Sequence, residues 1–309
     1  MIDRLELKAY GKINLGLDVV RKREDGYHEV RMIMQTVHLH DRILMERTEG
    51  QLQVTSDLSY VPDGEGNLAY RAARLLMDEF GITGGLSVQI RKRIPVAAGM
   101  AGGSTDAAAV LVGVNRMFDL GLSRKELMER GLRLGADVPY CILRGTALSE
   151  GIGEVLTELP APPSCHLVLA KPQISVSTKE VYGKLRVNEL KPEEHPDIDG
   201  MAEAIRQGDL DGIIERLGNV LETVTVPAHP EISRMKKILL DHGAAGTLMS
   251  GSGPTVFGMF KDLEDAEKAC QALREAEGRN LTKQAYVSGF FNPVRIGKTG
   301  KGRDGHASV

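Results

Sequence analysis

An alternation of apolar and polar residues opens the chain. Apolar side chains occupy odd-numbered positions from Leu5 to Val19, which is the period of a β-strand with one buried face. The same period places Lys12, Asn14 and Asp18 together on the opposite face. The pattern therefore predicts a half-buried strand that carries a short row of polar side chains.

Strand and helix patterns alternate irregularly along the rest of the chain. Asp25-Gly26 is typical of a hairpin turn, with the returning strand after it. The other strands are predicted at 29–44, 52–54, 86–90, 166–170, 255–260 and 284–291. Helices are predicted at 67–76, 104–117, 123–135, 177–182, 201–205, 210–217, 230–241 and 265–275, several of them begun by Ser or Asn caps. This mixed order indicates an α+β fold.

A proline-rich stretch, Leu159-Pro160-Ala161-Pro162-Pro163, marks the predicted domain boundary because it is stiff and extended. A chain of 309 residues suits two domains. We predict an N-terminal domain over 1–159 and a C-terminal α+β domain over 160–293. The Gly-rich and charged tail, 294–309, is predicted to be disordered.

Composition narrows the function classes. Lys and Arg total 39 against 42 Asp and Glu, so a broad basic surface for nucleic acid is not expected. Cys141, Cys165 and Cys270 lack metal-ligand spacing and are expected to be reduced, buried thiols. The N-terminus has no apolar signal sequence and no run reaches the length of a membrane span, which predicts a cytoplasmic protein.

A glycine-rich loop followed by a helix, around Gly99, Gly102 and Gly103, is the strongest chemical signal. Glycines let a ligand approach the backbone, and the free N–H groups of a helix's first turn bind anions. Ser104 is the expected helix cap. The loop matches neither the P-loop nor the dinucleotide-binding fingerprint. Taken alone, it fits a phosphate site or a tight turn without a ligand equally well.

Three ordered segments together resemble the motifs of the GHMP kinases. They are Ala9–Leu17, the glycine loop Pro95–Ala109, and Met249–Gly258. The resemblance runs from about Leu5 to about Phe291, with Met100 and Thr105 standing where Leu and Ser are usual. It implies a two-domain kinase fold, an active site in the interdomain cleft, and ATP with Mg²⁺.

Further blocks resemble one branch of this family, whose substrate is an isoprenoid precursor alcohol carrying a diphosphocytidyl group. They are Asp25–His28, Gly66–Leu68 and Gly135–Pro139. For ATP, the resemblance implies the loop itself and two residues near the adenine. The loop residues are Pro95, Val96, Ala97, Ala98, Gly99, Met100, Ala101, Gly102, Gly103, Ser104 and Thr105, and the other two are Asn67 and Lys92.

Magnesium would be held at the start of the helix. Ser104 and Thr105 could offer hydroxyl oxygens to phosphate or Mg²⁺. Asp106 is ambiguous, and helix capping is favoured there over metal binding because an acid in the first turn suits the helix dipole.

Asp137 is the candidate base. Pro139 moves Val138 out of helical conformation, so Asp137 lies in a turn, and local sequence alone would make it an N-cap. The resemblance instead implies that Asp137 accepts the hydroxyl proton and that Lys12 keeps it ionised. Lys12 would otherwise be a solvated lysine.

The alcohol substrate is assigned to Asn14, Tyr27, His28 and Tyr182. The resemblance implies that Tyr27 and Tyr182 stack on the cytosine and that His28 binds its edge. Ordinary hairpin and core packing are the alternatives for these rings. The Gly251–Gly253 loop would either approach phosphates or close the site.

Three rival functions remain open at this stage. The first is a GHMP kinase for a small alcohol such as homoserine or mevalonate, which would need no pair of stacking rings. The second is a catalytically silent binding protein of the same fold, against which Lys12 and Asp137 argue. The third is a nucleic-acid binder, which the acidic balance disfavours. The expected partner is a small-molecule substrate, with no nucleic acid or membrane, in a monomer or a homodimer.

Overall fold

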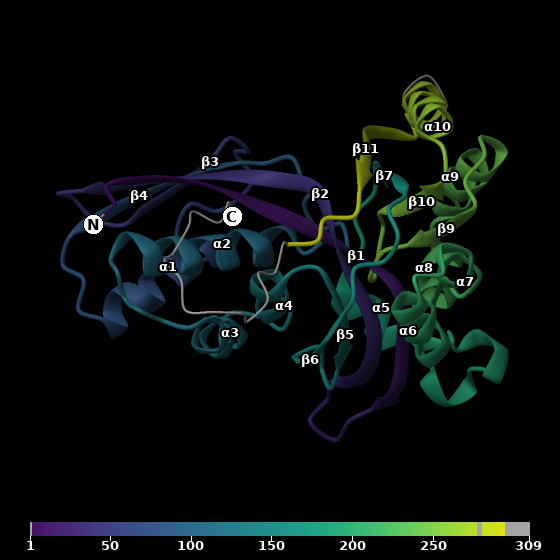
Figure 1. Cartoon of the computed structure of the whole chain (residues 1–309), viewed down its shortest axis with the longest axis horizontal. Helices are drawn as coiled ribbons and strands as arrows, with labels where there is room; N and C mark the ends of the chain where they lie inside the picture. The colour runs from purple at the N-terminus through teal and green to yellow at the C-terminus, as the bar shows by residue number, and fades with distance from the viewer. Residues whose placement is uncertain (1, 277–279, 294–309) are drawn as a thin grey trace.

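The computed structural model describes residues 2–276 and 280–293, and within them two β-sheets carry the fold (Figure 1). The first sheet runs in the order β3-β4-β2-β1-β8, with β5 and β6 added beside β2. Its strands are β1 (Arg4–Lys22), β2 (His28–Thr48), β3 (Gln53–Ser56), β4 (Gly85–Arg91), β5 (Thr146–Glu150), β6 (Val155–Leu159) and β8 (Gly218–Asn219).

The second sheet is smaller and antiparallel, in the order β11-β7-β10-β9. Its strands are β7 (His166–Pro172), β9 (Gly246–Met249), β10 (Val256–Phe260) and β11 (Thr282–Gly289). The mixture of strands and helices confirms the predicted α+β class.

Helices cover each sheet. The first four lie along one side of the first sheet, while α9 and α10 pack against the second (Figure 1). Their bounds are α1 (Leu68–Glu79), α2 (Gly102–Met117), α3 (Arg124–Leu132), α4 (Val138–Leu143), α9 (Pro230–Asp241) and α10 (Leu263–Glu275). The connecting segment holds α5 (Thr178–Lys184), α6 (Ile198–Gln207), α7 (Leu210–Glu215), α8 (Glu222–Ala228) and two 3₁₀ turns, Val187–Glu189 and Pro192–Glu194.

Strand β1 is buried on both faces at its centre, so the half-buried prediction was wrong there. Its register against β2 shifts between Tyr10 and Lys12 and again between Asn14 and Gly16. Between Asn14 and Gly16, β1 carries one more residue than β2, and this extra residue turns the side chains that follow it to the other face. The predicted polar row is therefore broken. Lys12 and Asn14 face the cavity described below, whereas Asp18 does not line it and pairs with His195.

Local capping signals mostly predict the helix starts. Asn67 caps α1 by accepting from the Ala69 N–H at 2.9 Å, and Ser123 forms the complete capping box of α3. Ser177 caps α5. The prediction failed at α2, where Ala101 occupies the N-cap in a left-handed conformation (φ 56°) and Ser104 lies inside the first turn.

The C-terminal half of the chain returns to the first sheet. Strand β8 pairs in parallel with β1 at Gly16 and Leu17, and Phe290 forms a bridge with Val37 of β2. The predicted boundary falls between β6 and β7, but these returning contacts fasten the two parts together. The β5–β6 hairpin, α8, β8 and β9 were not predicted, and residues 294–309 lie outside the described part.

Candidate active site

A single large cavity collects most of the predicted site residues. Its volume is about 990 Å³, at the upper end of the range for one small ligand, which leaves room for two. From the first sheet and its helices, it is lined by Lys12, Asn14, Leu17, Lys22, Gly26, Tyr27, His28, Val30, Met32, Leu68, Ala97, Ala98, Gly99, Ala101, Gly102, Gly103, Ser104, Ala136, Asp137 and Ile152. The later part of the chain adds Val176, Thr178, Lys179, Tyr182, Gly183, Gly251, Ser252 and Gly253.

One buried hydroxyl joins the three motifs. Ser250 Oγ donates to the Gly99 carbonyl at 2.9 Å and accepts from the Asn14 N–H at 3.3 Å. Asn219 of β8 also holds the third motif, because its Nδ2 donates to the carbonyls of Met249 and Gly251. Ser250 stands in the third motif, but no pattern of residues predicts this linking role.

The glycine loop closes tightly onto the third motif. Gly99 has a φ of 74°, and a Cβ added there would lie 2.0 Å from the Ser250 carbonyl oxygen. Gly251 faces the loop from the other side, with its own φ of 58°. The Gly251–Gly253 segment therefore forms a wall of the cavity against the loop.

Helix α2 begins at the cavity. Its 16 residues point their N-terminus at the space beside Gly102, Gly103 and Ser104. The first N–H bonded inside the helix is that of Thr105, to the Ala101 carbonyl, so the preceding donors have no partner within the helix. Such an end attracts phosphate.

The predicted magnesium ligands separate. Thr105 is buried and donates its hydroxyl to the Tyr10 carbonyl at 2.7 Å, so that proton holds the helix to β1. Ser104 alone of the pair lines the cavity. The described residues contain no group of three or more His, Cys, Asp or Glu that could hold a metal.

Asp106 does not cap α2, contrary to our prediction. It is buried and accepts a hydrogen bond from Lys92 Nζ at 2.6 Å, while its Oδ1 has no hydrogen-bond partner. Lys92 also donates to Asp41 at 2.5 Å, and Asp41 accepts from the Ile94 backbone N–H. Burial raises the pKa of Asp106, with Asp41 adding to the rise and Lys92 opposing it.

Several predicted ATP residues lie behind the cavity wall. Lys92 belongs to the buried cluster just described, and both polar atoms of Asn67 are engaged, with Pro62 and Ala69. Neither residue lines the cavity, and their placement near the adenine stays a prediction. The same holds for Pro95, Val96, Met100 and Thr105 of the loop.

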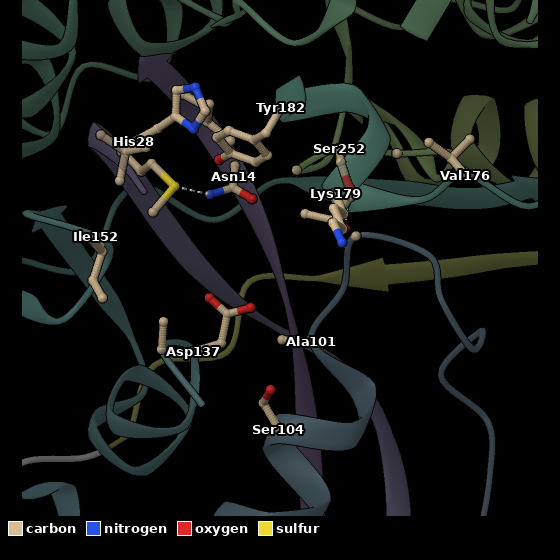
Figure 2. A pocket seen from close by; sticks show the side chains of 18 of the residues that line it. Asn14, His28, Ala101, Ser104, Asp137, Ile152, Val176, Lys179, Tyr182 and Ser252 are labelled. Carbon is tan, nitrogen blue, oxygen red and sulfur yellow. Dashed lines mark hydrogen bonds between the residues drawn. The ribbon is translucent and has the colours of Figure 1, made fainter. Parts of the chain in front are cut away.

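The candidate catalytic pair shares one wall. Asp137 precedes α4 without making a side-chain cap, and its carboxylate points into the cavity in Figure 2. Lys12 donates to Asn14 Oδ1 at 2.8 Å, and among the described residues it forms no ion pair with Asp137. The electrostatic pairing of Lys12 with Asp137 that the resemblance implies therefore stays a prediction.

Electrostatics still link the two residues. Burial raises the pKa of the Cys141 thiol, Asp137 raises it further, and Lys12 lowers it, so both charges act on one buried group. Burial and then Asp137 also raise the pKa of Tyr182. Asp137 therefore acts electrostatically on Tyr182 and, together with Lys12, on the buried thiol of Cys141.

Aromatic side chains form the far wall. Tyr27 sits in the β1–β2 turn and is 61% exposed, although it lines the cavity. The His28 and Tyr182 rings lie 5.2 Å apart at an angle of 47°. Burial, followed by the charge of Lys22, lowers the pKa of His28, so its ring is neutral at pH 7. A neutral imidazole offers one donor and one acceptor.

Two glycine substitutions separate a phosphate cradle from packing. We expect Gly103→Val to weaken ATP binding by about tenfold or more while the protein stays folded. Gly103 lines the cavity, and a Cβ added there meets nothing closer than Leu68 at 3.7 Å, so the substitution does not clash with the backbone. Gly99→Ala should instead destabilise the fold by clashing with Ser250. Calorimetry with ATP and urea unfolding distinguish the two; unchanged affinity in folded Gly103→Val would refute the cradle.

Cys141, Cys165 and Cys270 are free and buried, as the sequence predicts. No helix in the described part of the chain is both long and apolar enough to cross a membrane.

The fold and this site define a small-molecule kinase of the GHMP class. Residues 67–145 match the family model for the GHMP kinases N-terminal domain, and residues 201–279 match that for the C-terminal domain. A homoserine kinase from Cytophaga hutchinsonii superposes with a TM-score of 0.73 over 93% of this chain and 95% of that one; at 20% identity this shows the fold alone.

Comparison with curated relatives narrows the GHMP class to one kind of kinase. The 4-diphosphocytidyl-2-C-methyl-D-erythritol kinase of Lachnospira eligens is 50% identical over 94% of this chain and all of its own length. That of Lachnoclostridium phytofermentans is 51% identical over 96% and all of its length. A crystal structure of 4-(cytidine 5'-diphospho)-2C-methyl-D-erythritol kinase gives a TM-score of 0.79 at 32% identity, covering 93% of this chain and 100% of that one. The chain belongs to the family of 4-diphosphocytidyl-2-C-methyl-D-erythritol kinases.

Proposed function

We propose that the protein transfers the γ-phosphoryl group of ATP to the 2-hydroxyl of 4-diphosphocytidyl-2-C-methyl-D-erythritol, in non-mevalonate isoprenoid precursor synthesis. The observation that carries this proposal is one cavity with a helix N-terminus at one wall and Tyr27, His28 and Tyr182 at another. The first wall suits a triphosphate and the second suits a cytosine.

Asp137 is the proposed base. Its carboxylate makes no cap and faces the cavity between the phosphate wall and the aromatic wall, where the acceptor hydroxyl must lie. The hydroxyl oxygen attacks the γ-phosphorus, the bond to the β-phosphate oxygen breaks, and Asp137 takes the hydroxyl proton.

Lys12 and Asn14 are proposed to position the acceptor. Both are almost fully buried, at 6% and 0% exposure, yet they line the cavity. Their mutual hydrogen bond holds the Lys12 ammonium at the floor of the site. When substrate enters, this cation favours the ionised form of Asp137 and the developing negative charge on the hydroxyl oxygen.

ATP is assigned to the glycine loop and the α2 N-terminus. Mg²⁺, carried in with the nucleotide, would neutralise phosphate charge, with Ser104 as its hydroxyl contact from the chain. A cytoplasmic location and a monomeric or homodimeric state belong to the proposal.

The direct test measures ATP consumption with the cytidyl alcohol, mevalonate and homoserine in parallel. We expect turnover with the cytidyl alcohol and at most traces with the other two. CMP or CDP should inhibit competitively against the alcohol and not against ATP. Turnover of mevalonate or homoserine alone would replace the proposed substrate, and no turnover with any alcohol would favour a silent binding protein.

The aromatic wall yields a separate prediction. We expect Tyr27→Ala and His28→Ala to raise the KM for the cytidyl substrate by about tenfold or more, with the KM for ATP nearly unchanged. Stacking on a base and a lost hydrogen bond each cost about 1–3 kcal/mol. Tyr60→Ala is the matched control, because Tyr60 is similarly exposed, at 67%, but lies outside the cavity lining. If both variants keep the wild-type KM, the rings do not bind the base.

A further inference from the structure

The cavity lining contains lysines to which the proposed reaction assigns no role. Its charged lining consists of Lys12, Lys22 and Lys179 against the single carboxylate of Asp137. The whole chain is slightly acidic, with a formal charge of -3, so this excess is local. Lys12 is engaged with Asn14, which leaves Lys22 and Lys179 without an assigned partner in the site.

We propose that Lys179 binds the triphosphate of ATP from the second part of the chain, opposite the glycine loop. This inference rests on the proposed function for the identity of the phosphate donor. Lys179 is exposed, and within the described residues neither a carboxylate nor any other side chain pairs with it. Its charge is therefore available to a ligand.

The start of α5 is held against the third motif. Thr178 Oγ1 and Ser252 Oγ lie 2.8 Å apart, and Ser252 is buried in the wall next to Gly251 and Gly253. That wall packs on the glycine loop through Gly99 and Ser250. Lys179 follows Thr178 directly, and in Figure 2 it reaches into the cavity beside Ser252, with Ala101 below it. Its position is thus fixed next to the loop.

Two residues of α5, Lys179 and Tyr182, line the cavity at different positions along the helix. Tyr182 lies three residues after Lys179, about 4.5 Å further along the axis, and lines the same cavity. Its ring packs with His28, on the wall assigned to the cytosine. Lys22, whose charge acts on His28, lies at that end and suits the diphosphate of the alcohol substrate. Lys179, at the other end, is left for the triphosphate.

The test compares Lys179→Met with Lys179→Arg and with Lys184→Met. Lys184 is exposed on the same helix but lies outside the cavity lining, so it controls for general charge and helix effects. Binding of ATP, ADP and AMP is measured by calorimetry, and KM and kcat are measured for ATP and the alcohol. A charged hydrogen bond lost to phosphate corresponds to about a ten- to hundredfold effect.

We expect Lys179→Met to weaken ATP by at least about tenfold, ADP by less, and AMP hardly at all. The KM for the alcohol should stay near wild type, and Lys179→Arg should retain most of the affinity. Equal affinity for ATP in wild type and Lys179→Met, or a loss confined to the alcohol, would overturn the proposal. The calorimetry needs no alcohol, so it stands even if the wild-type protein turns over none of the tested alcohols, which is how failure of the proposed function would show itself.

Discussion

Asp137→Asn should lower kcat by about 10²–10⁴-fold, the usual contribution of a positioned base, while ATP still binds. The amide keeps the shape of the carboxylate but cannot accept the hydroxyl proton. The structure favours this outcome because the Asp137 side chain forms no helix cap, so its charge is not used to start α4.

Stability provides the control for this variant. Loss of a capping side chain costs about 1 kcal/mol, whereas a carboxylate that only lines a cavity can be neutralised with little change in unfolding. We therefore expect the urea midpoint of Asp137→Asn to equal that of wild type. Near-native turnover at saturating substrates, or a clear loss of stability with turnover intact, would make Asp137 a structural residue.

Local sequence rules predicted the elements that depend on neighbouring residues. Asn67 and Ser123 cap helices where expected, and the hairpin turns at Gly26 with a φ of 85°. The faces of β1 were misjudged because its pairing with β2 shifts register at three places, which no local pattern reveals. The resemblance predicted 13 of the 28 residues that line the cavity, because phosphate and base contacts occur at fixed motif positions.

The partners of three polar residues near the glycine loop could not be predicted from the sequence. The resemblance implies ligand contacts for Thr105 and Lys92, and the local sequence favours a helix cap for Asp106. In the structure Thr105 donates to the Tyr10 carbonyl, and Lys92 donates to both Asp106 and Asp41. These partners come from other parts of the chain. Long-range pairing of this kind, like the linking role of Ser250, is invisible until the sheet is assembled.

The buried cluster of Asp41, Lys92 and Asp106 carries the largest expected effect on stability. The side chains of Lys92, Asp41 and Asp106 are 4%, 0% and 5% exposed, so water hardly shields them. Removing one member of a buried ion pair leaves an uncompensated charge and costs about 3–5 kcal/mol. We expect Lys92→Met to lose this amount of unfolding free energy, measured by urea denaturation at pH 8.

Two controls make the result specific. Lys125→Met removes a lysine that is 87% exposed and only weakly paired with Glu129, so it should change stability by no more than about 0.5 kcal/mol. Adding Asp106→Asn to Lys92→Met removes one of the two buried carboxyl groups left without a cation, and with it the cost of keeping that group protonated at pH 8, so it should restore part of the loss. A double variant less stable than Lys92→Met alone would contradict the assignment of the cost to buried charge.

The pH dependence follows from Asp106. Burial raises the pKa of Asp106 from 3.8 to about 8, against the lowering by Lys92. A group whose pKa is raised on folding contributes stability that is fully present below pH 3.8 and is lost as the pH rises toward 8. Without the opposing charge of Lys92, Asp106 holds its proton more tightly in the folded state, so the variant loses stability up to a higher pH. The difference in unfolding free energy between wild type and Lys92→Met should therefore stay nearly constant up to about pH 7 and grow as the pH passes 8. A difference independent of pH across this range would show that lost packing, and not buried charge, sets the cost.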